Sequence, residues 1–341
     1  MAWWGYDTMC TNQYLLGGET MAQSELQKTL KAKARKETKK NLKNNWILYI
    51  FLLPAVVYIG MFHYGPMYGL ILAFKNYKGA LGIMGSPWVG TRWFTTFFKS
   101  PLFSRLIRNT LIISFYQLIV GFPMPIILAI MLNYINNVFF KKFAQTLTYI
   151  PYFISTVILV SMMTLFFSPN SGFINTIIKS ITGMKDGIYF MGTSKYFRHM
   201  YVWSGVWQGT GYSAVIYIAA LAGVSMELHE AAIIDGASIW KRIWHIDIPS
   251  IMPTIVILLV MQCGSIINVG YEKVLLMQNQ LNRDVSEVIS TYVYNVSFPT
   301  DGSAPNYGYS TAIGLLNNVI NFIILIIANA VANKLTGSGL W

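Results

Sequence analysis

Charged side chains are scarce in this sequence. Asp, Glu, Lys and Arg together supply 11% of its 341 residues, whereas hydrophobic residues supply 54%. Soluble domains average about 25% charged residues, so the composition excludes a soluble enzyme of this length. The two cysteines, Cys10 and Cys263, imply neither a disulfide framework nor a metal cluster. The composition therefore indicates a polytopic membrane protein.

Catalytic and nucleotide-binding motifs are absent as well. The sequence contains no Gly-x-x-x-x-Gly-Lys-Ser/Thr phosphate loop, so the chain cannot hydrolyse ATP alone, and we expect it to hold no cofactor. It also lacks His-Glu-x-x-His, Cys-x-x-Cys and Gly-x-Ser-x-Gly, which mark metalloprotease, redox or zinc, and serine-hydrolase sites. We therefore do not expect an enzyme.

Carboxylates are nearly absent from the long apolar runs. Ion-coupled transporters usually keep such groups deep in their spans. Glu272 and Lys273 come closest, at one end of the fifth run, where they either pair with each other or contact a substrate. This scarcity argues against proton or sodium coupling and favours an external energy source.

Six long apolar runs define the expected fold. A helix that spans a bilayer needs about 20 largely apolar residues, and proline inside several runs predicts kinks that neighbouring helices can tolerate. We therefore predict an all-α protein with six transmembrane helices at residues 46–73, 106–134, 143–167, 199–224, 251–276 and 310–335.

A basic tail precedes the first run and indicates the orientation. Such a tail normally stays in the cytoplasm, so we expect both termini inside and the loops at 75–105, 168–198 and 277–309 outside. The charge signal over the whole chain is mixed, because Lys and Arg, with the tail included, split almost evenly between the two sides. The tail explains much of the net charge of +12, so no nucleic-acid partner is expected. Residues 1–20 are interpreted either as an over-extended start of the reading frame or as a disordered leader. The basic residues of the tail are Lys28, Lys31, Lys33, Arg35, Lys36, Lys39, Lys40 and Lys43.

A polar segment at about 225–249 lies between the fourth and fifth runs and carries its own ordering signals. Ser225 is suited to cap a short helix, and Gly236 can end that helix because glycine tolerates left-handed backbone. Ser238 is suited to cap a second short helix, and Pro249 opens the next apolar run. Two small helices joined by a glycine predict a rigid knob shaped to sit in a partner's groove. We call residues 225–249 the knob.

The same residues carry a family resemblance that extends from about residue 45 to the C-terminus. Glu230-Ala-Ala, Asp235-Gly-Ala and Ile-x-Ile-Pro249, with Pro253 four residues further on, resemble the EAA loop of ABC importer permeases. Their spacing is similar to that of the maltose-type carbohydrate permeases, and Asn-Trp-Ile-Leu-Tyr-Ile-Phe-Leu-Leu-Pro54 and Gly-Leu-Trp341 resemble the F-type subunit. Ile243 departs from the usual aromatic residue and Ile248 from the usual Leu.

The resemblance implies a type I ABC importer permease fold (MetI-like). It also implies a multi-pass protein of the plasma membrane of a prokaryote. It divides the chain into a cytoplasmic tail (1–45), a first helix with an external loop (46–105), a transmembrane core (106–335) and a cytoplasmic C-terminus (336–341). The implied partners are a second homologous permease, two ABC ATPase subunits that bind the ATP, and an extracellular or periplasmic sugar-binding protein. The residues implied to couple to the ATPases are Glu230, Ala231, Ala232, Asp235, Gly236, Ala237 and Pro249.

Polar and aromatic residues in the fourth and fifth runs suit a sugar pathway. Sugars are bound by aromatic faces, amides and hydroxyls, and Ser265, Asn268 and Glu272 have the spacing of one helical face. The alternative is that such residues join helices by hydrogen bonds. The same two readings apply to the amides of Asn317, Asn318 and Asn321, as pathway lining or inter-subunit packing. By resemblance, the pathway residues are Gln208, Gly209, Tyr212, Ser265 and Asn268.

The expected function is that of a membrane subunit of an ATP-driven, binding-protein-dependent oligosaccharide importer. The alternatives are a permease for another polar solute, a secondary carrier, which would need carboxylates inside the membrane, and a membrane-embedded enzyme, which would need an acid/base or metal set. Arg92, Arg105, Arg108 and Lys185 on the predicted outer side fit either an acidic sugar or ordinary solvated charge.

Overall fold

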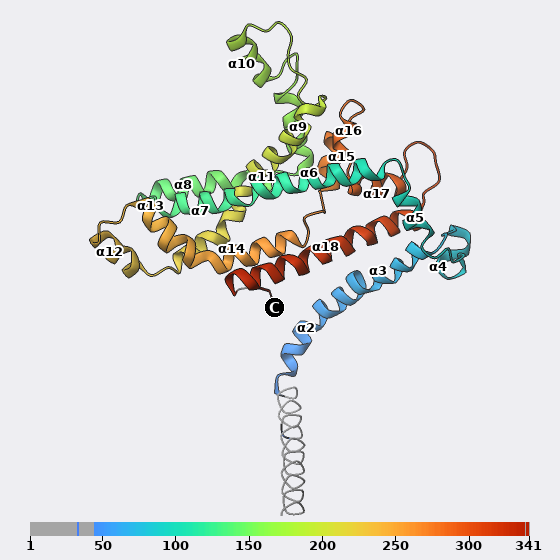
Figure 1. Ribbon diagram of the computed structural model, residues 1–341, viewed down its shortest axis with the longest axis horizontal. Coiled ribbons are helices and arrows are strands. Elements are labelled where there is room, and N and C mark those ends of the chain that lie inside the picture. Colours follow the sequence, from blue (N-terminus) through green and yellow to red (C-terminus); the bar gives the residue numbers. More distant parts are fainter. Residues whose placement is uncertain (1–32, 34–43, 338, 341) are drawn as a thin grey trace, which may run out of the picture. The chain divides into compact units, whose positions relative to one another are not determined.

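The computed structural model describes residues 33, 44–337 and 339–340 (Figure 1). Apart from Lys33, the basic tail lies outside these residues, as do residues 1–20 with both of their interpretations. The chain divides into two compact units, Met1–Gly69 and Leu70–Trp341. Within the described part the secondary structure is helical, apart from one isolated bridge between Lys75 and Trp88.

From residue 44 on, the described part of the first unit is one apolar helical run. It comprises α2 (Trp46–Ile59), the π-helical segment η1 (Gly60–Tyr64) and α3 (Gly65–Met67), and residues 44–68 are all exposed. With its continuation η2 (Tyr68–Phe74), the run is long and apolar enough to cross a membrane. A helix that is apolar all round suits contact with lipid or with other membrane helices.

Among the described residues, four helices meet the length and composition of a membrane span, and two bent pairs meet them together. The bent pairs are Val138–Phe153 with Thr156–Phe166, at 99°, and Ser194–Ala222 with Met226–Ile234, at 72°. If each pair is one span, the total is six, in agreement with the prediction, and the all-α polytopic fold is confirmed. The four continuous spans are Trp46–Phe74, Phe103–Asn133, Ile239–Cys263 and Tyr307–Lys334.

The third span was predicted to be one continuous helix, but in the structure it is broken. Helix α8 (Val138–Tyr149) passes into the 3-10 turn η4 (Ile150–Phe153), and α9 (Thr156–Phe166) starts afresh in another direction. The Ser155 hydroxyl accepts a hydrogen bond from the Ile158 N–H and so caps α9, which makes the break a helix start.

The fifth span ends earlier than predicted. Helix α14 (Ile248–Cys263) stops at Gly264, turns follow, and α15 (Tyr271–Met277) begins only after Gly270. The prediction of one span over 251–276, with Ser265, Asn268 and Glu272 on one helical face, is therefore wrong. Glycine favours such an exit, because it weakens a helix interior.

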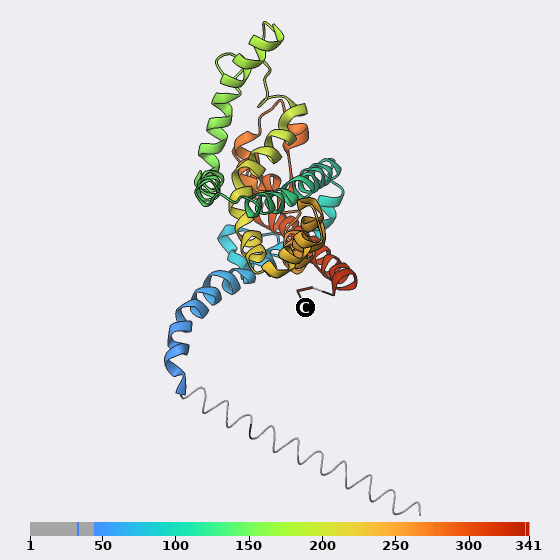
Figure 2. The ribbon, with the colours of Figure 1, turned by 90° about the vertical axis from the view of Figure 1, so that its left-hand side faces the viewer.

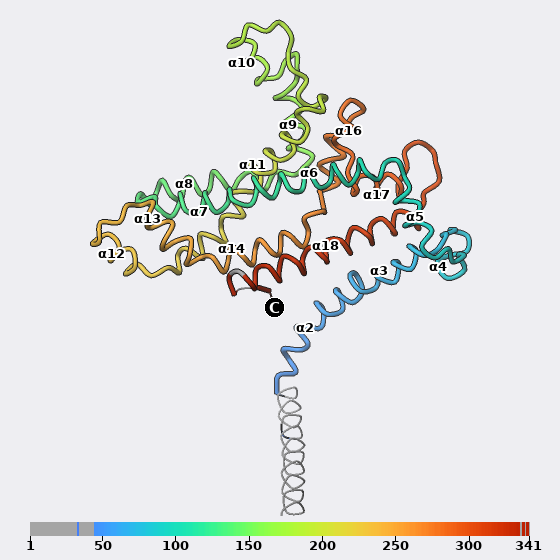
Figure 3. Tube along the Cα trace, in the orientation of Figure 1, coloured from blue at the N-terminus to red at the C-terminus, as the bar shows by residue number. Residues whose placement is uncertain are grey.

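The second unit is organised around α11 (Ser194–Ala222), which packs against α6 (Phe103–Gly121) and α7 (Pro123–Asn133). Its core includes Ile113, Phe197 and Val202, each almost fully buried. Helices α14 and α18 (Tyr307–Thr336) lie side by side, as Figure 3 shows. Figures 1 and 2 both place α10 (Phe173–Thr182) at the tip of an arm beyond α9. The remaining elements are η3 (Gly79–Leu81), α4 (Gly82–Gly85), α5 (Arg92–Phe98), α12 (Met226–Ile234), α13 (Ile239–Arg242), η5 (Ile243–Asp247), α16 (Arg283–Ser286) and α17 (Ile289–Ser297).

Candidate functional site

The first helix of the knob, α12, starts and ends as predicted. The Ser225 hydroxyl accepts from the Glu227 N–H at 3.2 Å. At the other end Gly236 has φ +74°, and the N–H groups of Gly236 and Ala237 donate to the carbonyls of Ile233 and Ala232. This pair of bonds around a left-handed glycine is a Schellman motif, which explains why the turn needs no further support.

The second part of the knob is not a separate short helix. Ser238 caps α13 through the Lys241 N–H, at 3.4 Å, but α13 continues through the π-helical η5 into α14. Proline normally clashes with the carbonyl four residues before it, and Pro249 directly follows the wider π turn, which leaves room for its ring. The second part of the knob is therefore the end of a continuous helical span, Ile239–Cys263.

A buried polar cluster ties the two parts of the knob together, and sequence reasoning missed it. Asp247 is fully buried, and its Oδ2 accepts from the Tyr134 hydroxyl of α7's C-cap at 2.7 Å. His229 Nε2 of α12 lies 3.4 Å from Asp247 Oδ1. Burial and the bond to Asp247 raise the pKa of the Tyr134 hydroxyl, so it keeps its proton and donates. The sequence signal that could have predicted this cluster is Asp247 itself, a lone carboxylate directly before Ile248-Pro249 in an otherwise apolar segment.

The outer face of the knob is unusually apolar for an exposed surface. Ile234 is 86% exposed and Trp240 is 72% exposed, beside the exposed carboxylate of Glu230. Of the predicted coupling residues, Ala231, Asp235, Gly236 and Pro249 are exposed as well, whereas Ala232 and Ala237 are half-buried. Apolar patches of this kind mark protein or membrane contacts.

Two of the predicted pathway residues meet in one small cavity of about 130 Å³, here called the polar cavity. Ser265 and Asn268 enter it from the turn after α14, and Ser114 and Gln117 enter it from α6. Ser114 and Gln117 were not predicted, because single polar residues in an apolar run carry little signal of their own. The full lining is Ser114, Gln117, Leu118, Gln262, Ser265, Ile266, Asn268 and Val269.

Asn268 is held in place by the last helix. Its Oδ1 accepts from Asn317 Nδ2 at 2.8 Å and from Asn321 Nδ2 at 2.9 Å, while Asn321 Oδ1 accepts from the Ile267 N–H. Asn317 and Asn321 therefore bind within this chain, whereas Asn318 is exposed. Because Asn268 remains exposed and its Oδ1 is occupied, its Nδ2 is the group left to donate to a ligand.

The three remaining pathway residues do not enter the polar cavity. Tyr212 lines a neighbouring cavity of about 390 Å³, which shares Gln262 with the polar cavity, and its ring stacks on Tyr152 at 3.9 Å. Gln208 donates to the Ile154 carbonyl at 2.7 Å, so it holds the broken third span against α11. Gly209 has open space around its Cα and lines neither cavity.

Glu272 and Lys273 were expected either to pair or to contact a substrate. Lys273 Nζ instead donates to the Tyr201 carbonyl at 2.9 Å and lies 4.8 Å from the centre of the Tyr201 ring. Its charge is therefore used to attach α15 to α11, while Glu272 remains exposed.

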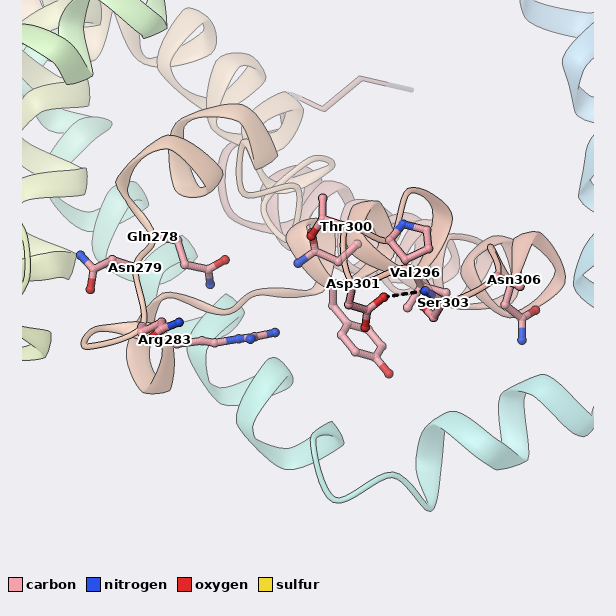
Figure 4. Close-up of a pocket in the computed structure, with 13 residues that line it drawn as sticks. Gln278, Asn279, Arg283, Val296, Thr300, Asp301, Ser303 and Asn306 are labelled. Atoms are coloured by element: carbon pink, nitrogen blue, oxygen red, sulfur yellow. Dashed lines mark hydrogen bonds between the residues drawn. The ribbon is translucent and has the colours of Figure 1, made fainter.

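A larger cavity of about 570 Å³, the loop cavity, opens between α16 and the segment before α18. Figure 4 shows Gln278, Asn279 and Arg283 on one side of it and Thr300 and Asp301 on the other. Its charges are already engaged. Arg283 pairs with Glu287 at 3.0 Å, and hydrogen bonds from Ser303 lower the pKa of Asp301.

Comparisons with known proteins identify a family that this chain matches. Residues 121–337 match the family described as "Binding-protein-dependent transport system inner membrane component". The chain is 42% identical over 300 residues to Protein LplB of Bacillus subtilis (strain 168), covering 88% of this chain and 92% of that one. It is 39% identical over 294 residues to the polygalacturonan/rhamnogalacturonan transport system permease protein YteP of the same organism, covering 86% and 90%.

Two solved structures that resemble this chain come from bacterial ABC transporters. The chain resembles one from a bacterial ABC transporter involved in the import of the acidic polysaccharide alginate, with a TM-score of 0.79 and 37% identity over 87% of this chain and 98% of that one. A second structure of a bacterial alginate ABC transporter, in complex with an alginate pentasaccharide-bound periplasmic protein, matches with a TM-score of 0.79 and 36% identity, over 88% of this chain and 99% of that one.

Proposed function

Because the chain belongs to the family of binding-protein-dependent transport system inner membrane components, we propose that it forms half of the translocation pathway of an ATP-driven oligosaccharide importer. The names of its relatives support a saccharide substrate, since they include a polygalacturonan/rhamnogalacturonan permease and an alginate transporter. A sugar-binding protein delivers the substrate, as the complex of the alginate transporter with its periplasmic protein suggests.

The proposed coupling rests on one observation, the exposed face of the knob. It combines isolated apolar side chains such as Ile234 and Trp240 with the carboxylate of Glu230, and it stands on a turn that Gly236 makes rigid. A cleft on each of two ATPase subunits, one for this chain and one for a second homologous permease, would cover the apolar part. A basic residue there would pair with Glu230.

Motion at the knob has a direct route to the pathway. The span Ile239–Cys263 extends for about 35 Å at 1.5 Å per residue, with the knob at one end and Gln262 of the polar cavity at the other. The Asp247 cluster links this span to α12 and to the end of α7. ATP-driven closure of the ATPase dimer would therefore rock the helices as a body, and the polar cavity would open to one side at a time.

The pathway itself is proposed to use neutral hydrogen-bonding groups. Asn268 offers its Nδ2, Ser265 and Gln117 offer further polar atoms around it, and Tyr212 offers an exposed ring next to Gln262. Such groups satisfy sugar hydroxyls without a fixed charge. Gln208 and Gly209, which line neither cavity, remain in the proposal only through the resemblance.

The orientation is proposed from the basic tail, with both termini and the knob in the cytoplasm. In a cysteine-free background, a membrane-impermeant thiol reagent applied to intact cells is expected to label Gly85→Cys and Lys185→Cys and to miss Ser238→Cys. Lys185 serves better than its neighbour Gly187, where a Cβ would lie 1.9 Å from the Pro169 carbonyl oxygen. Labelling at position 238 before the cells are opened would reverse the orientation.

The function is tested in proteoliposomes that contain this chain with its partner permease and ATPases. Uptake of a labelled trisaccharide should require ATP on the knob side and the binding protein on the other. Uptake that proceeds without ATP but responds to a proton or sodium gradient would instead identify a secondary carrier.

A further inference from the structure

A fourth cavity, of about 500 Å³, lies beside the start of α11, and we call it the basic cavity. Helix α11 has 29 residues and so extends about 40 Å, with this cavity near one end and the knob after the other. If the knob faces the ATPases, the basic cavity faces the side from which substrate arrives. Its lining is Ile112, Tyr116, Ser194, Lys195, Arg198, His199 and Val285.

Positive charge exceeds negative charge around the basic cavity. Lys195 and Arg198 line it, Arg108 lies close enough to repel Arg198, and no carboxylate is in the lining. The two acidic residues nearby are already engaged. Asp284 attracts Arg198 and accepts from the Ser194 hydroxyl at 2.5 Å, and the buried Glu287 accepts from both Arg105 and Arg283.

The Arg198 guanidinium is positioned by a hydrogen bond to a buried side chain. Its Nη2 donates to Asn109 Oδ1 at 3.1 Å. Asn109 is fully buried and is itself fixed by the carbonyls of Asp284 and Glu287, at 2.8 and 3.1 Å. Arg198 Nε is also buried and has no hydrogen-bond partner among the described residues. A guanidinium positioned in this way loses little entropy when it meets a carboxylate.

The hydrogen bonds around Tyr116 also orient His199. Trp203 Nε1 can only donate, and it donates to the Tyr116 oxygen at 3.0 Å. The Tyr116 oxygen also shares a hydrogen bond with His199 Nδ1, at 2.8 Å. This bond orients the exposed His199 ring, so its Nε2 is the ring nitrogen left to contact a ligand.

Further along α11 from the basic cavity, the exposed side chains are aromatic, and we call them the aromatic stripe. Lys195, His199, Trp203 and Trp207 are each four residues apart, so each lies next to the following one in a stripe that winds slowly around α11. Trp203 and Trp207 are 49% and 50% exposed, and exposed ring faces of this kind suit the apolar faces of sugar rings. A basic end followed by aromatic rings matches a ligand with both carboxylates and pyranose rings.

We propose that the basic cavity and its aromatic stripe form an entry site for acidic oligosaccharides, in which Lys195 and Arg198 bind a uronate carboxylate and Trp203 receives the ring. This inference rests on the proposed function and narrows its substrate class. An anionic lipid headgroup would satisfy the cations too, but it would not explain the two exposed tryptophans of the stripe.

The test compares two probes in the assembled complex, trigalacturonate and its fully methyl-esterified form, which keeps the rings and loses the charge. Lys195→Gln is expected to raise the KM for trigalacturonate uptake by about three- to tenfold and to leave that for the ester unchanged. Lys195→Arg should restore uptake. Lys99→Gln removes an exposed lysine from the C-cap of α5 and serves as the matched control, with no effect on either probe.

Three outcomes would overturn the site. They are equal wild-type KM values for the two probes, an equal effect of Lys99→Gln, and a Lys195→Gln effect that disappears in proteoliposomes of purely zwitterionic lipid, which would assign the cavity to lipid. In each of these cases ATP-driven saccharide uptake persists and the proposed function stands. If the complex transports no saccharide with ATP, the proposed function fails, and the entry site fails with it.

Discussion

The knob and the polar cavity lie at opposite ends of the same helical span, yet they are built in different ways. The knob is organised by neighbours in sequence, since Ser225 caps α12 and Gly236 ends it. The polar cavity is organised by residues far apart in the chain, since Asn268 depends on Asn317 and Asn321. A coupling element with local order keeps its shape whichever way the span tilts, whereas a pathway assembled across helices changes when those helices move.

The largest expected effect is at the docking face of the knob. Glu230→Lys replaces a proposed ion pair by repulsion, which costs on the order of a few kcal/mol if the pair is desolvated. We expect uptake to fall by more than tenfold while ATP hydrolysis becomes independent of the binding protein. Glu230→Ala should be milder.

The control for this prediction is Asp186→Lys, which makes the same change of sign on an exposed residue after α10. It should leave uptake unchanged. Normal coupled uptake by Glu230→Lys in an assembled complex would contradict the docking role.

The second prediction concerns the buried link between knob and span. Asp247→Ala leaves the Tyr134 hydroxyl and His229 without their partner, and each stranded group costs about 1–3 kcal/mol. We expect a lower thermal midpoint of the purified complex and weaker coupling of ATP hydrolysis to transport. Asp235→Ala removes an exposed carboxylate twelve positions earlier and should change the midpoint little. Equal midpoints for the two variants would show that the cluster contributes nothing.

The third prediction separates the two roles of Asn268. Asn268→Leu removes the acceptor for Asn317 and Asn321 and should reduce both stability and uptake. Asn268→Asp keeps an acceptor for both amides but loses the free Nδ2 donor. If that donor binds sugar, Asn268→Asp assembles normally and loses uptake by about five- to a hundredfold in apparent affinity. Unchanged uptake would reduce Asn268 to a joint between helices.

The smallest effects are expected when Gly236, in the turn of the knob, is replaced by alanine or asparagine. A Cβ at Gly236 meets nothing within 4 Å, so Gly236→Ala suffers only from its left-handed backbone, at about 1 kcal/mol. Gly236→Asn should be tolerated, because Asn adopts this conformation more readily. Uptake should fall a fewfold for Ala, remain near normal for Asn, and be lost for Gly236→Pro. Equal loss for Ala and Asn would point to a requirement for space in the partner rather than for the turn.

Much of the fold was predictable because bilayer thickness translates directly into sequence. The apolar runs marked every span, since about 20 apolar residues cross the membrane wherever they occur. The breaks were not predictable from hydropathy. Ile154–Ser155 and the turns after Cys263 lie inside apolar stretches, and what allows them is the partner each exposed backbone group finds, such as Gln208 for the Ile154 carbonyl.

The sequence by itself determined the two local features of the knob, its caps and its glycine turn, because helix ends are decided by a few adjacent residues. The tertiary structure alone decided the rest of the site. It brought Tyr134 and His229 to Asp247, turned the predicted face of the fifth span into a loop held by α18, and gathered Arg198 and Tyr116 around the basic cavity, with Trp203 bonded to Tyr116. Those contacts join residues up to 113 positions apart, and no local pattern encodes which distant partner a buried polar group will meet.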